Sequence, residues 1–317
     1  LDIDLKTNKQ NDKSPLIIRP KTIELKDVES KASLSKNESI YSALKLGLQD
    51  YVKKNKFTQV LIGISGGIDS ALTAAICVDA LGAENVIGVA MPSKYNSKDS
   101  LDDAIKLSDN LGINLKTIEI EKIVDDFRET LTNSLNEELG HITDENIQSR
   151  VRGNILMGLS NQTGAMVVST GNKSEMAVGY STLYGDLAGG FALIKDLYKT
   201  KVYELSNYIN SISDVIPKNI ITKEPSAELR PNQFDSDSLP DYEVLDKILN
   251  LYIEEDSSSE KIIASGVDPK LVFDVLEKVD RNEYKRKQVA PGVKLTQKAF
   301  GKDRRMPITN TYIRQKE

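Results

Sequence analysis

A polar turn with two adjacent glycines, SGGIDS at residues 65–70, stands between two apolar stretches of this 317-residue chain. The residues before it, VLIGI at 60–64, are typical of a short buried strand, and residues 71–82 repeat small and apolar side chains as a buried helix does. A strand that passes at once through a glycine turn into a helix is typical of an α/β protein. This feature restricts the fold more than any other part of the sequence.

The strand, turn and helix together predict an anion-binding site in the turn. The free N–H groups of the helix and the positive end of its dipole would face whatever the turn holds. Gly66 and Gly67 allow the backbone to approach a ligand closely, and the hydroxyl groups of Ser65 and Ser70 add donors. The turn lacks the Lys-Ser/Thr ending of the GxxxxGKS/T signature, so it is not the usual triphosphate-binding loop.

Asp69 occupies the place of the missing lysine. A carboxylate beside phosphate groups is repulsive unless a cation lies between them, so Asp69 predicts Mg²⁺ bound between the turn and a nucleotide. The competing interpretation is a tight strand–helix turn in which Asp69 and Ser70 only cap the helix, because both residue types are favoured there.

Apolar runs and helical patterns alternate along the first two thirds of the chain. A first helix is expected through Tyr41 and Val52, strands at 60–64, 86–91, 115–120 and 165–169, and helices at 100–111, 121–138 and 144–162. Strands separated by helices of this length predict a parallel sheet covered by helices on both faces. Ligands of such sheets bind beyond the carboxyl ends of the strands, where residues 65–70, 91–94 and 170–175 would meet.

The chain changes character past residue 200. Interrupted helices are expected at 203–209, 242–252 and 270–279, and a mobile loop over 223–240, which is rich in proline and acidic residues. Residues 1–35 are polar and predict an extended lead-in or linker remnant, followed by one domain over 36–317. Because the first residue is leucine, we expect the chain to be a piece of a longer protein.

Charge and cysteine content argue against several classes of function. With 42 basic and 47 acidic residues the formal net charge is −5, so no global field attracts nucleic acid or an anionic membrane. No apolar run reaches the length of a membrane span, and nothing resembles a signal peptide. The single cysteine, Cys77, lies among apolar residues, which excludes an internal disulfide and a cysteine-rich metal site. We therefore expect a cytoplasmic protein that binds neither nucleic acid nor membranes.

The SGGIDS turn resembles the SGGxDS pyrophosphate loop of the N-type ATP pyrophosphatases, which cleave ATP between the α and β phosphates. Further motifs, in order from about residue 40 to 309, resemble those of NAD⁺ synthetase. Their residues are most similar to those of the synthetase domain of the glutamine-dependent members. These motifs are GNKSE at 171–175, YSTLYGD at 180–186, KDLYKT at 195–200, KEPSAEL at 223–229 and YKRK at 284–287. The resemblance implies an adenine-nucleotide alpha-hydrolase-like fold with a mainly helical C-terminal part.

The resemblance implies a ligase reaction that makes NAD⁺ from deamido-NAD⁺. ATP adenylylates the nicotinate carboxylate, pyrophosphate leaves, and ammonia attacks the acyl adenylate to release AMP and NAD⁺. Such a reaction needs positioning and charge stabilisation but no covalent nucleophile. We predict that residues 93–99 and 224–240 close over the substrates and exclude water.

The resemblance also implies partners. It implies Mg²⁺, a homodimer and an upstream glutaminase domain with a Glu-Lys-Cys triad, which these 317 residues do not contain. Because the only cysteine, Cys77, is expected in a core helix, we expect this chain alone to use free ammonia.

Individual residues take roles by the same resemblance. The catalytic residues would be Asp69, Glu175 and Lys199, with Asp69 and Glu175 as the metal ligands. The ATP-binding residues would be Gly63, Ile64, Ser65, Gly66, Gly67, Ile68, Asp69, Ser70, Thr170, Lys199 and Ser226. The residues for deamido-NAD⁺ would be Asn146, Arg150, Glu175, Asp186 and Lys285.

A few positions depart from the family pattern. Ser226 stands where many relatives have threonine, a change that keeps the hydroxyl. Leu183 stands where some ammonia-dependent members have lysine, and residues 184–190 lack a later acid found in those members. Tyr284 replaces a histidine next to Lys285. The roles on the deamido-NAD⁺ side therefore rest on fewer matched positions than the turn does.

Plainer interpretations remain for single residues and for the whole chain. Glu175 and Asp186 could be exposed acids, Arg150 could belong to a solvated face, Lys199 could favour a helix end, and His141 is expected to be structural. Another adenylating enzyme of the same loop family, such as a GMP synthetase or a tRNA-modifying enzyme, is the alternative activity. A non-catalytic adenine-nucleotide-binding module is the alternative of a different class, although such a module has little need for two metal-binding acids.

Overall fold

The structure is a computed structural model that describes residues 34–309. The expected lead-in at 1–35 therefore lies almost entirely outside the described residues, and its boundary stays a prediction. The first described helix, α1 (Lys36–Lys54), begins with a capping box: the Ser35 hydroxyl accepts from Glu38 N–H, 3.2 Å, and the Glu38 carboxylate accepts from Ser35 N–H, 3.3 Å. The helix thus begins just before the one expected through Tyr41 and Val52.

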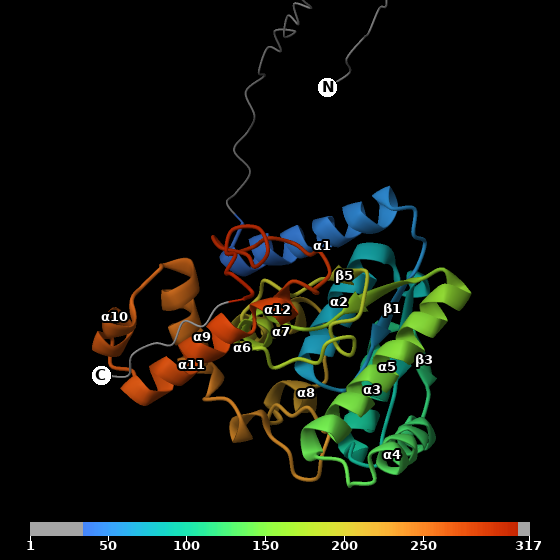
Figure 1. Cartoon of the computed structure of the whole chain (residues 1–317). Coiled ribbons are helices and arrows are strands. Elements are labelled where there is room, and N and C mark those ends of the chain that lie inside the picture. The colour runs from blue at the N-terminus through green and yellow to red at the C-terminus, as the bar shows by residue number, and fades with distance from the viewer. Residues whose placement is uncertain (1–33, 310–317) are drawn as a thin grey trace, which may run out of the picture. The chain divides into compact units, whose positions relative to one another are not determined.

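A five-stranded sheet forms the centre of the described residues, and every strand pair in it is parallel. The strands are β1 (Val60–Gly63), β2 (Val86–Ala90), β3 (Asn114–Thr117), β4 (Met166–Ser169) and β5 (Phe191–Ala192), in the spatial order β3-β2-β1-β4-β5. The predicted α/β fold with a parallel sheet is confirmed (Figure 1). Strand β5 was not expected, because two residues are too short to show a strand pattern.

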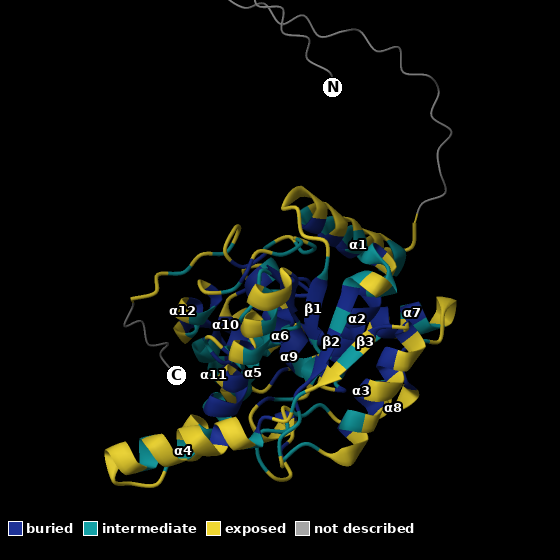
Figure 2. Cartoon of the chain, turned by 90° about the vertical axis from the view of Figure 1, so that its right-hand side faces the viewer, coloured by how far each residue is buried: buried dark blue, intermediate teal, exposed yellow. Residues whose placement is uncertain are grey.

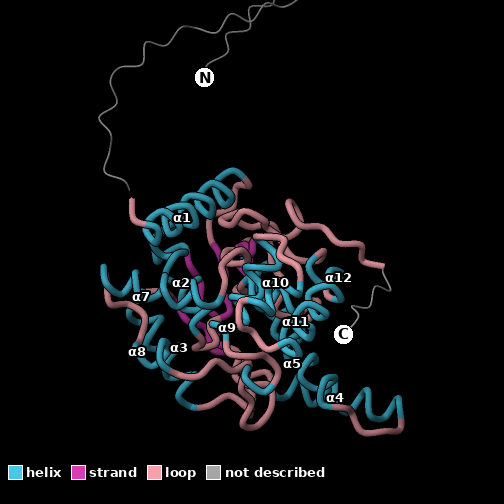
Figure 3. The backbone as a smooth tube through the Cα atoms, turned by 90° about the vertical axis from the view of Figure 1, so that its left-hand side faces the viewer, coloured by secondary structure: helices cyan, strands magenta, loops and turns pink. Residues whose placement is uncertain are grey.

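Alternating side chains of β1 enter two separate hydrophobic cores. Val60 and Ile62 pack in a core with residues of α1 and of further helices, whereas Leu61 packs on the opposite face. The helices of the first face include α2 (Ile68–Leu81), α3 (Lys98–Leu111) and α7 (Lys199–Ile212), and those of the second are α4 (Glu121–Leu135) and α5 (His141–Thr163). The expected coverage of both faces is confirmed (Figures 2 and 3), and it explains why the central strands β1 and β4 are apolar on both sides.

Several element boundaries differ from the expected ones. Helix α4 ends at Leu135 because Asn136 adopts a left-handed conformation with φ of 55°. Helix α5 begins at His141, three residues before the expected start. Its N-cap residue is Gly140, which has no side chain to cap the helix. Strand β3 ends at Thr117, where the chain leaves the regular ladder although Ile118 N–H still donates to Ala90 O.

The C-terminal part is mainly helical, as expected. Its elements are α6 (Lys173–Val178), α8 (Lys218–Thr222), α9 (Tyr242–Leu249), a π-helix (Asn250–Glu254), α10 (Ser259–Ala264), α11 (Pro269–Arg281) and α12 (Glu283–Arg286). Leu245, Ile248, Val272 and Leu276 centre a hydrophobic core of their own. Between α8 and α9, the segment 223–240 contains only a short 3₁₀ turn, Asp235–Asp237. None of the helices in the described residues is both long and apolar enough to cross a membrane.

The order of the strands fixes where a ligand site can form. Strands β2 and β3 lie on one side of β1, and β4 and β5 lie on the other. The connections after β1 and β4 therefore diverge to opposite sides, which opens a crevice beyond the carboxyl ends of these two neighbouring strands. Residues 65–70 follow β1 and residues 170–175 follow β4, so both predicted loops lie at this point.

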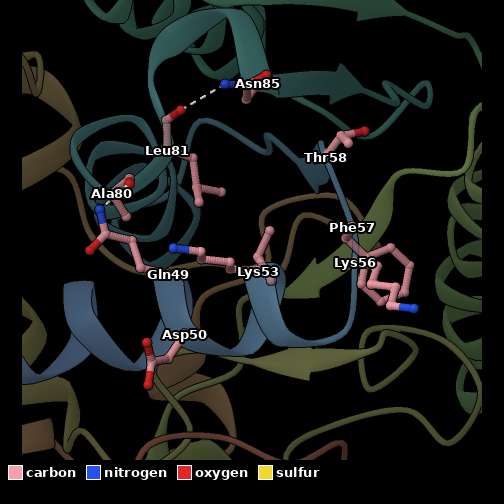
Figure 4. Close-up of a pocket in the computed structure, with 10 residues that line it drawn as sticks. Gln49, Asp50, Lys53, Lys56, Phe57, Thr58, Ala80, Leu81 and Asn85 are labelled. Atoms are coloured by element: carbon pink, nitrogen blue, oxygen red, sulfur yellow. Dashed lines mark hydrogen bonds between the residues drawn. The ribbon is translucent and has the colours of Figure 1, made fainter.

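A shallow cavity of about 540 Å³ lies elsewhere, where the C-terminal ends of α1 and α2 meet (Figure 4). Lys53, Phe57 and Asn85 are among its lining residues, and the Asn85 amide donates to the free Leu81 carbonyl, 2.8 Å. Helix α2 has 14 residues, so at 1.5 Å per residue the cavity is about 20 Å from residues 65–70. It is therefore separate from the sheet edge where the predicted loops meet.

Candidate active site

The turn at 65–70 joins β1 to α2 in a conformation that needs glycine. Gly66 has φ of 78°, and a Cβ at this position would lie 2.1 Å from the Ser100 carbonyl oxygen at the start of α3. The Ser70 hydroxyl donates to Gly67 O, 2.9 Å, and lies 3.2 Å from the Ser65 hydroxyl. The turn is thus fixed internally and against α3, with Asp69 in the first turn of α2.

The loop after β4 carries the second predicted acid on a short capped helix. Asn172 and Glu175 form a capping box at the start of α6: Glu175 N–H donates to Asn172 Oδ1, 3.0 Å, and Glu175 Oε2 accepts from Asn172 N–H, 3.4 Å. The Asn172 amide also donates to Asp69 Oδ1, 3.0 Å. One asparagine therefore orients both carboxylates.

Lys199, the first residue of α7, lies between the two acids. Its Nζ is 2.5 Å from Asp69 Oδ2 and 3.5 Å from Glu175 Oε1, and only 3% of its side chain is exposed. Although burial opposes the charged form, the carboxylates of Asp69 and Glu175 hold the pKa of Lys199 well above its ordinary value. Burial, and then the charge of Asp69, raise the pKa of Glu175. The three predicted catalytic residues therefore form one electrostatic unit.

Asp69 and Glu175 suit a Mg²⁺ site in which substrate phosphates and water supply the remaining ligands. Mg²⁺ is usually held by one or two carboxylates together with substrate phosphates and water. Asp69 and Glu175 supply two carboxylates, with 17% and 19% of their side chains exposed, next to a turn suited to phosphate. In the part of the chain that the structure describes, no group of three or more His, Cys, Asp or Glu residues is placed to hold a metal ion by itself. The chemistry of these donors therefore suits a metal that arrives with a nucleotide.

Two residues next to Glu175 fasten α6 and α7 to the C-terminal part. The Ser174 hydroxyl donates to Asp246 of α9 and accepts from Lys199 N–H, 2.9 Å. The Lys173 side chain is completely buried, and its ammonium contacts Asp196 at 2.8 Å and Glu254 at 2.5 Å. The same ammonium donates to two groups of the last described stretch, Thr296 Oγ1 and Lys298 O. Residues far along the chain therefore hold the helix that carries Glu175.

The predicted deamido-NAD⁺ residues gather around the turn at 179–186. Thr182 joins two of them, because its hydroxyl donates to Asn146 Oδ1, 2.7 Å, and its N–H donates to Asp186 Oδ1, 2.6 Å. Lys285 Nζ donates to the carbonyl oxygens of residues 179 and 181, and Arg150 Nε donates to Leu183 O, 3.2 Å. Asn146, Arg150, Asp186 and Lys285 thus come from three separate parts of the chain to one turn.

Ser226 lies in the 223–240 segment, and its hydroxyl is engaged within that segment. It donates to Gln233 O, 2.5 Å, and accepts from Glu228 N–H, 3.1 Å. Glu228, in a left-handed conformation with φ of 49°, accepts from the side chains of Asn96, Ser97 and Ser100 at 2.7 to 2.9 Å. The 223–240 segment is therefore fastened to the start of α3, next to the turn at 65–70.

Sequence reasoning assigned no role to several residues of this site. The sequence did indicate a capping role for Asn172, since Asn-x-x-Glu before a helix is a capping-box pattern. Glu228 and Asp235 lie in a segment that was expected to be a mobile loop. No local sequence pattern indicates a role for Lys173, because its partners are up to 125 residues away. Among the residues expected to be structural, Cys77 is fully buried, as expected, and burial raises the pKa of its thiol.

Comparison with known proteins gives a consistent result. A family model described as NAD synthase matches residues 40–289. A glutamine-dependent NAD(+) synthetase of Thermotoga maritima is 55% identical over 279 residues, which cover 87% of this chain and 48% of that protein. The solved structure of glutamine-dependent NAD+ synthetase from Acinetobacter baumannii in complex with ADP has 48% identity and a TM-score of 0.61, covering 89% of this chain and 51% of that one.

A second solved structure is covered almost completely by this chain. The NH3-dependent NAD synthetase from Campylobacter jejuni has 30% identity and a TM-score of 0.64, covering 80% of this chain and 96% of that one. By contrast, the chain spans about half the length of the curated relatives that it matches. The family match extends from α1 past α12 and includes the sheet, both loops and Lys199. The chain therefore belongs to the NAD synthase family.

Proposed function

We propose that this chain catalyses the ATP-dependent amidation of deamido-NAD⁺ to NAD⁺, with release of AMP and pyrophosphate. The observation that carries the proposal is the Lys199 ammonium between the carboxylates of Asp69 and Glu175, at the edge where β1 and β4 end. Membership of the NAD synthase family supports this substrate over that of a GMP synthetase. The two acids favour an enzyme over a passive nucleotide-binding module.

In this proposal the ATP side of the site holds and neutralises phosphate. The turn at 65–70 binds the phosphates through backbone N–H groups and through the hydroxyls of Ser65 and Ser70. Mg²⁺ bound by Asp69 and Glu175 would neutralise charge on the departing pyrophosphate. Lys199 supplies a fixed positive charge next to the same phosphates. Gly63, Ile64, Thr170 and Ser226 complete the ATP-binding residues that we propose.

The turn at 179–186 would hold deamido-NAD⁺. Asp186 and Asn146 are joined through Thr182, which orients them as one polar surface. Arg150 and Lys285 add positive charge to this surface, which suits the phosphates of a dinucleotide. Glu175 contacts Lys199 on the ATP side, and helix α6, which carries Glu175, leads directly into this turn. Such an arrangement would bring the nicotinate carboxylate towards the α-phosphate of ATP.

We propose free ammonia as the nitrogen donor for this chain by itself. A glutaminase of the implied kind needs a reactive cysteine, and the single cysteine of this sequence is fully buried in α2. A relative that this chain covers almost completely is named an NH3-dependent synthetase, whereas a relative of which it covers about half is named glutamine-dependent. In a longer protein, a glutaminase domain would deliver the ammonia.

A homodimer is the partner arrangement that we propose. Helix α4 extends away from the sheet and is largely exposed (Figure 2). Along it Ile123, Phe127 and Leu135 are 39%, 45% and 56% exposed, and Ile142 at the start of α5 is 75% exposed. Apolar side chains repeated along one protruding helix are suited to packing against a second copy.

One assay tests activity, acceptor and donor together. The purified chain is incubated with ATP, Mg²⁺ and either deamido-NAD⁺ or xanthosine monophosphate, with ¹⁵N-ammonium or amide-¹⁵N-glutamine, and the products are identified by mass spectrometry. We expect labelled NAD⁺ from ammonium only. NAD⁺ labelled from glutamine would show that the proposed nitrogen donor is wrong. Amination of xanthosine monophosphate would show that the proposed acceptor is wrong. If no product formed, the proposed activity would be ruled out.

A further inference from the structure

Asp235 is a buried acid in the 223–240 segment, where a polar loop would be expected to expose its charges. Only 6% of Asp235 is exposed, and its N–H donates to Pro225 O, 3.0 Å, next to Ser226. A carboxylate is costly to bury unless it has partners that hold its charge. The position of Asp235 is therefore set by specific contacts.

Tyr242, the first residue of α9, connects Asp235 to Lys199. The Tyr242 hydroxyl donates to Asp235 Oδ2, 2.7 Å, and the centre of its ring lies 5.1 Å from Lys199 Nζ. An ammonium at this distance from an aromatic ring is attracted to the ring. The hydrogen bond to Asp235 thus fixes a ring that in turn restrains Lys199.

The charge of Asp235 also acts on the acid pair. The side chain of Tyr242 alone separates the carboxylate of Asp235 from the ammonium of Lys199, and this ammonium contacts both Asp69 and Glu175. Negative charge in excess of positive charge at a poorly solvated site favours the binding of a cation. Each further carboxylate within reach should therefore strengthen cation binding at Asp69 and Glu175.

We propose that Asp235 is a positioning residue of this centre: it holds Lys199 through Tyr242 and strengthens the binding of a divalent cation at Asp69 and Glu175. The identity of the reaction in this inference rests on the proposed function, whereas the binding of the cation does not. Because Asp235 lies in the same segment as Ser226 and Glu228, the segment that contacts the ATP side also completes the charge around the metal-binding acids. The metal site and the segment are then coupled.

Asp237, two residues further along the same turn, provides a matched control. Its carboxylate is 40% exposed and pairs with Arg230 at the surface, 3.0 Å. Both Asp235→Asn and Asp237→Asn remove one negative charge from the same 3₁₀ turn. Only the first removes it next to Tyr242.

The experiment measures Mn²⁺ binding to the full chain by electron paramagnetic resonance, in the presence of an ATP analogue with a non-cleavable α,β bridge. We expect Asp235→Asn to weaken Mn²⁺ binding roughly three- to tenfold and Asp237→Asn to change it less than twofold. Wild-type Mn²⁺ affinity in folded Asp235→Asn would overturn the charge effect. Because no turnover is required, this result is independent of whether the wild-type chain makes NAD⁺.

Tyr242→Phe tests the positioning of Lys199 and keeps the proposal testable if Asp235→Asn does not fold. The variant retains the ring and the charge of Asp235 but removes the hydrogen bond between them. We expect Mn²⁺ affinity within twofold of wild type and a kcat about five- to tenfold lower, with little change in KM for ATP. A wild-type kcat in this variant would overturn the positioning role. If the wild-type chain itself makes no NAD⁺, the same assay shows that the proposed function has failed, which is distinct from a failure of the positioning role.

Discussion

Lys199 Nζ lies 2.5 Å from Asp69 Oδ2, so the ammonium occupies one side of a carboxylate that we assign to a metal ion. Asn172 holds the other oxygen of the same carboxylate at 3.0 Å. Each carboxylate oxygen has two lone pairs, so Asp69 can bind a divalent cation while it keeps both contacts. The ammonium of Lys199 would then stay next to the metal-bound phosphates, where its charge is useful.

Asp69→Asn should therefore lower pyrophosphate release by at least a hundredfold, because the variant keeps the shape of the side chain and loses its charge. Helical content measured by circular dichroism should be unchanged. Asp50→Asn, which alters an exposed acid on α1 paired with Lys54, serves as the control and should retain activity within twofold. Turnover near the wild-type rate in Asp69→Asn would remove this residue from the mechanism.

Glu228→Gln should loosen the 223–240 segment, because Glu228 accepts from three side chains at the start of α3 while held in a left-handed conformation. We expect limited proteolysis within 223–240 to be three- to tenfold faster than in the wild type. Glu224→Gln changes another acid of the segment, whose contact is with Ser236, and should have little effect. ATP with deamido-NAD⁺ should slow cleavage of the wild type, and equal rates with and without these substrates would contradict closure.

Glu121 should contribute a pH-dependent part of the stability. Burial opposes its charge, yet hydrogen bonds from Lys94 and Arg128 lower its pKa from 4.5 to about 2. Because the folded-state pKa is the lower one, the stabilisation is present above about pH 4.5 and is lost as the pH falls towards 2. With 29% of the side chain exposed, we expect Glu121→Gln to cost about 1–2 kcal/mol at pH 7.

Urea unfolding of the wild type and Glu121→Gln between pH 7 and pH 3 checks this expectation. The difference between the two proteins should be constant down to about pH 5 and should shrink below it. A difference that is the same at pH 3 and pH 7 would mean that the ion pair with Lys94 does not stabilise the fold.

Phe127→Asp should weaken a homodimer that forms through α4. Phe127 is 45% exposed on this helix, and a charge there would be buried without a partner in the assembly. We expect self-association measured by sedimentation to be at least tenfold weaker. Leu46→Asp, at an exposed position of α1, should leave the association unchanged. A wild-type chain that sediments as a monomer at all concentrations would rule out this assembly.

Lys173→Met should destabilise the protein by about 3–5 kcal/mol, because it leaves the buried carboxylates of Asp196 and Glu254 without their ammonium. Lys45→Met, which breaks a half-exposed pair with Asp79, should cost less than about 1 kcal/mol. Urea denaturation measures both. A small effect of Lys173→Met would mean that the two carboxylates find other partners or become protonated.

The sequence was sufficient to place the first loop of the site. Residues 65–70 combine glycine, hydroxyl and carboxylate groups between a strand and a helix, and all these signals are local. The carboxyl ends of parallel strands meet at one edge, so the meeting of this loop with residues 170–175 also followed from the alternation of strands and helices.

The parts that the sequence could not provide depend on contacts between distant residues. Lys173 and Glu254 are 81 residues apart, and Asn96 and Glu228 are 132 apart. No local pattern links such pairs. Helix α6 has six residues and β5 has two, so neither is long enough to show a period. The composition of the 223–240 segment predicted a mobile loop, whereas Asp235 is buried and accepts a hydrogen bond from Tyr242, which lies outside that segment.

The complete burial of Cys77 in α2 has a practical consequence for observing this protein at work. Since the sequence contains no other thiol, a cysteine introduced at the surface would be the sole accessible attachment point for a fluorophore or spin label. Labels placed on the 223–240 segment and on α3 would report the separation of these elements in real time, with the native cysteine left in place.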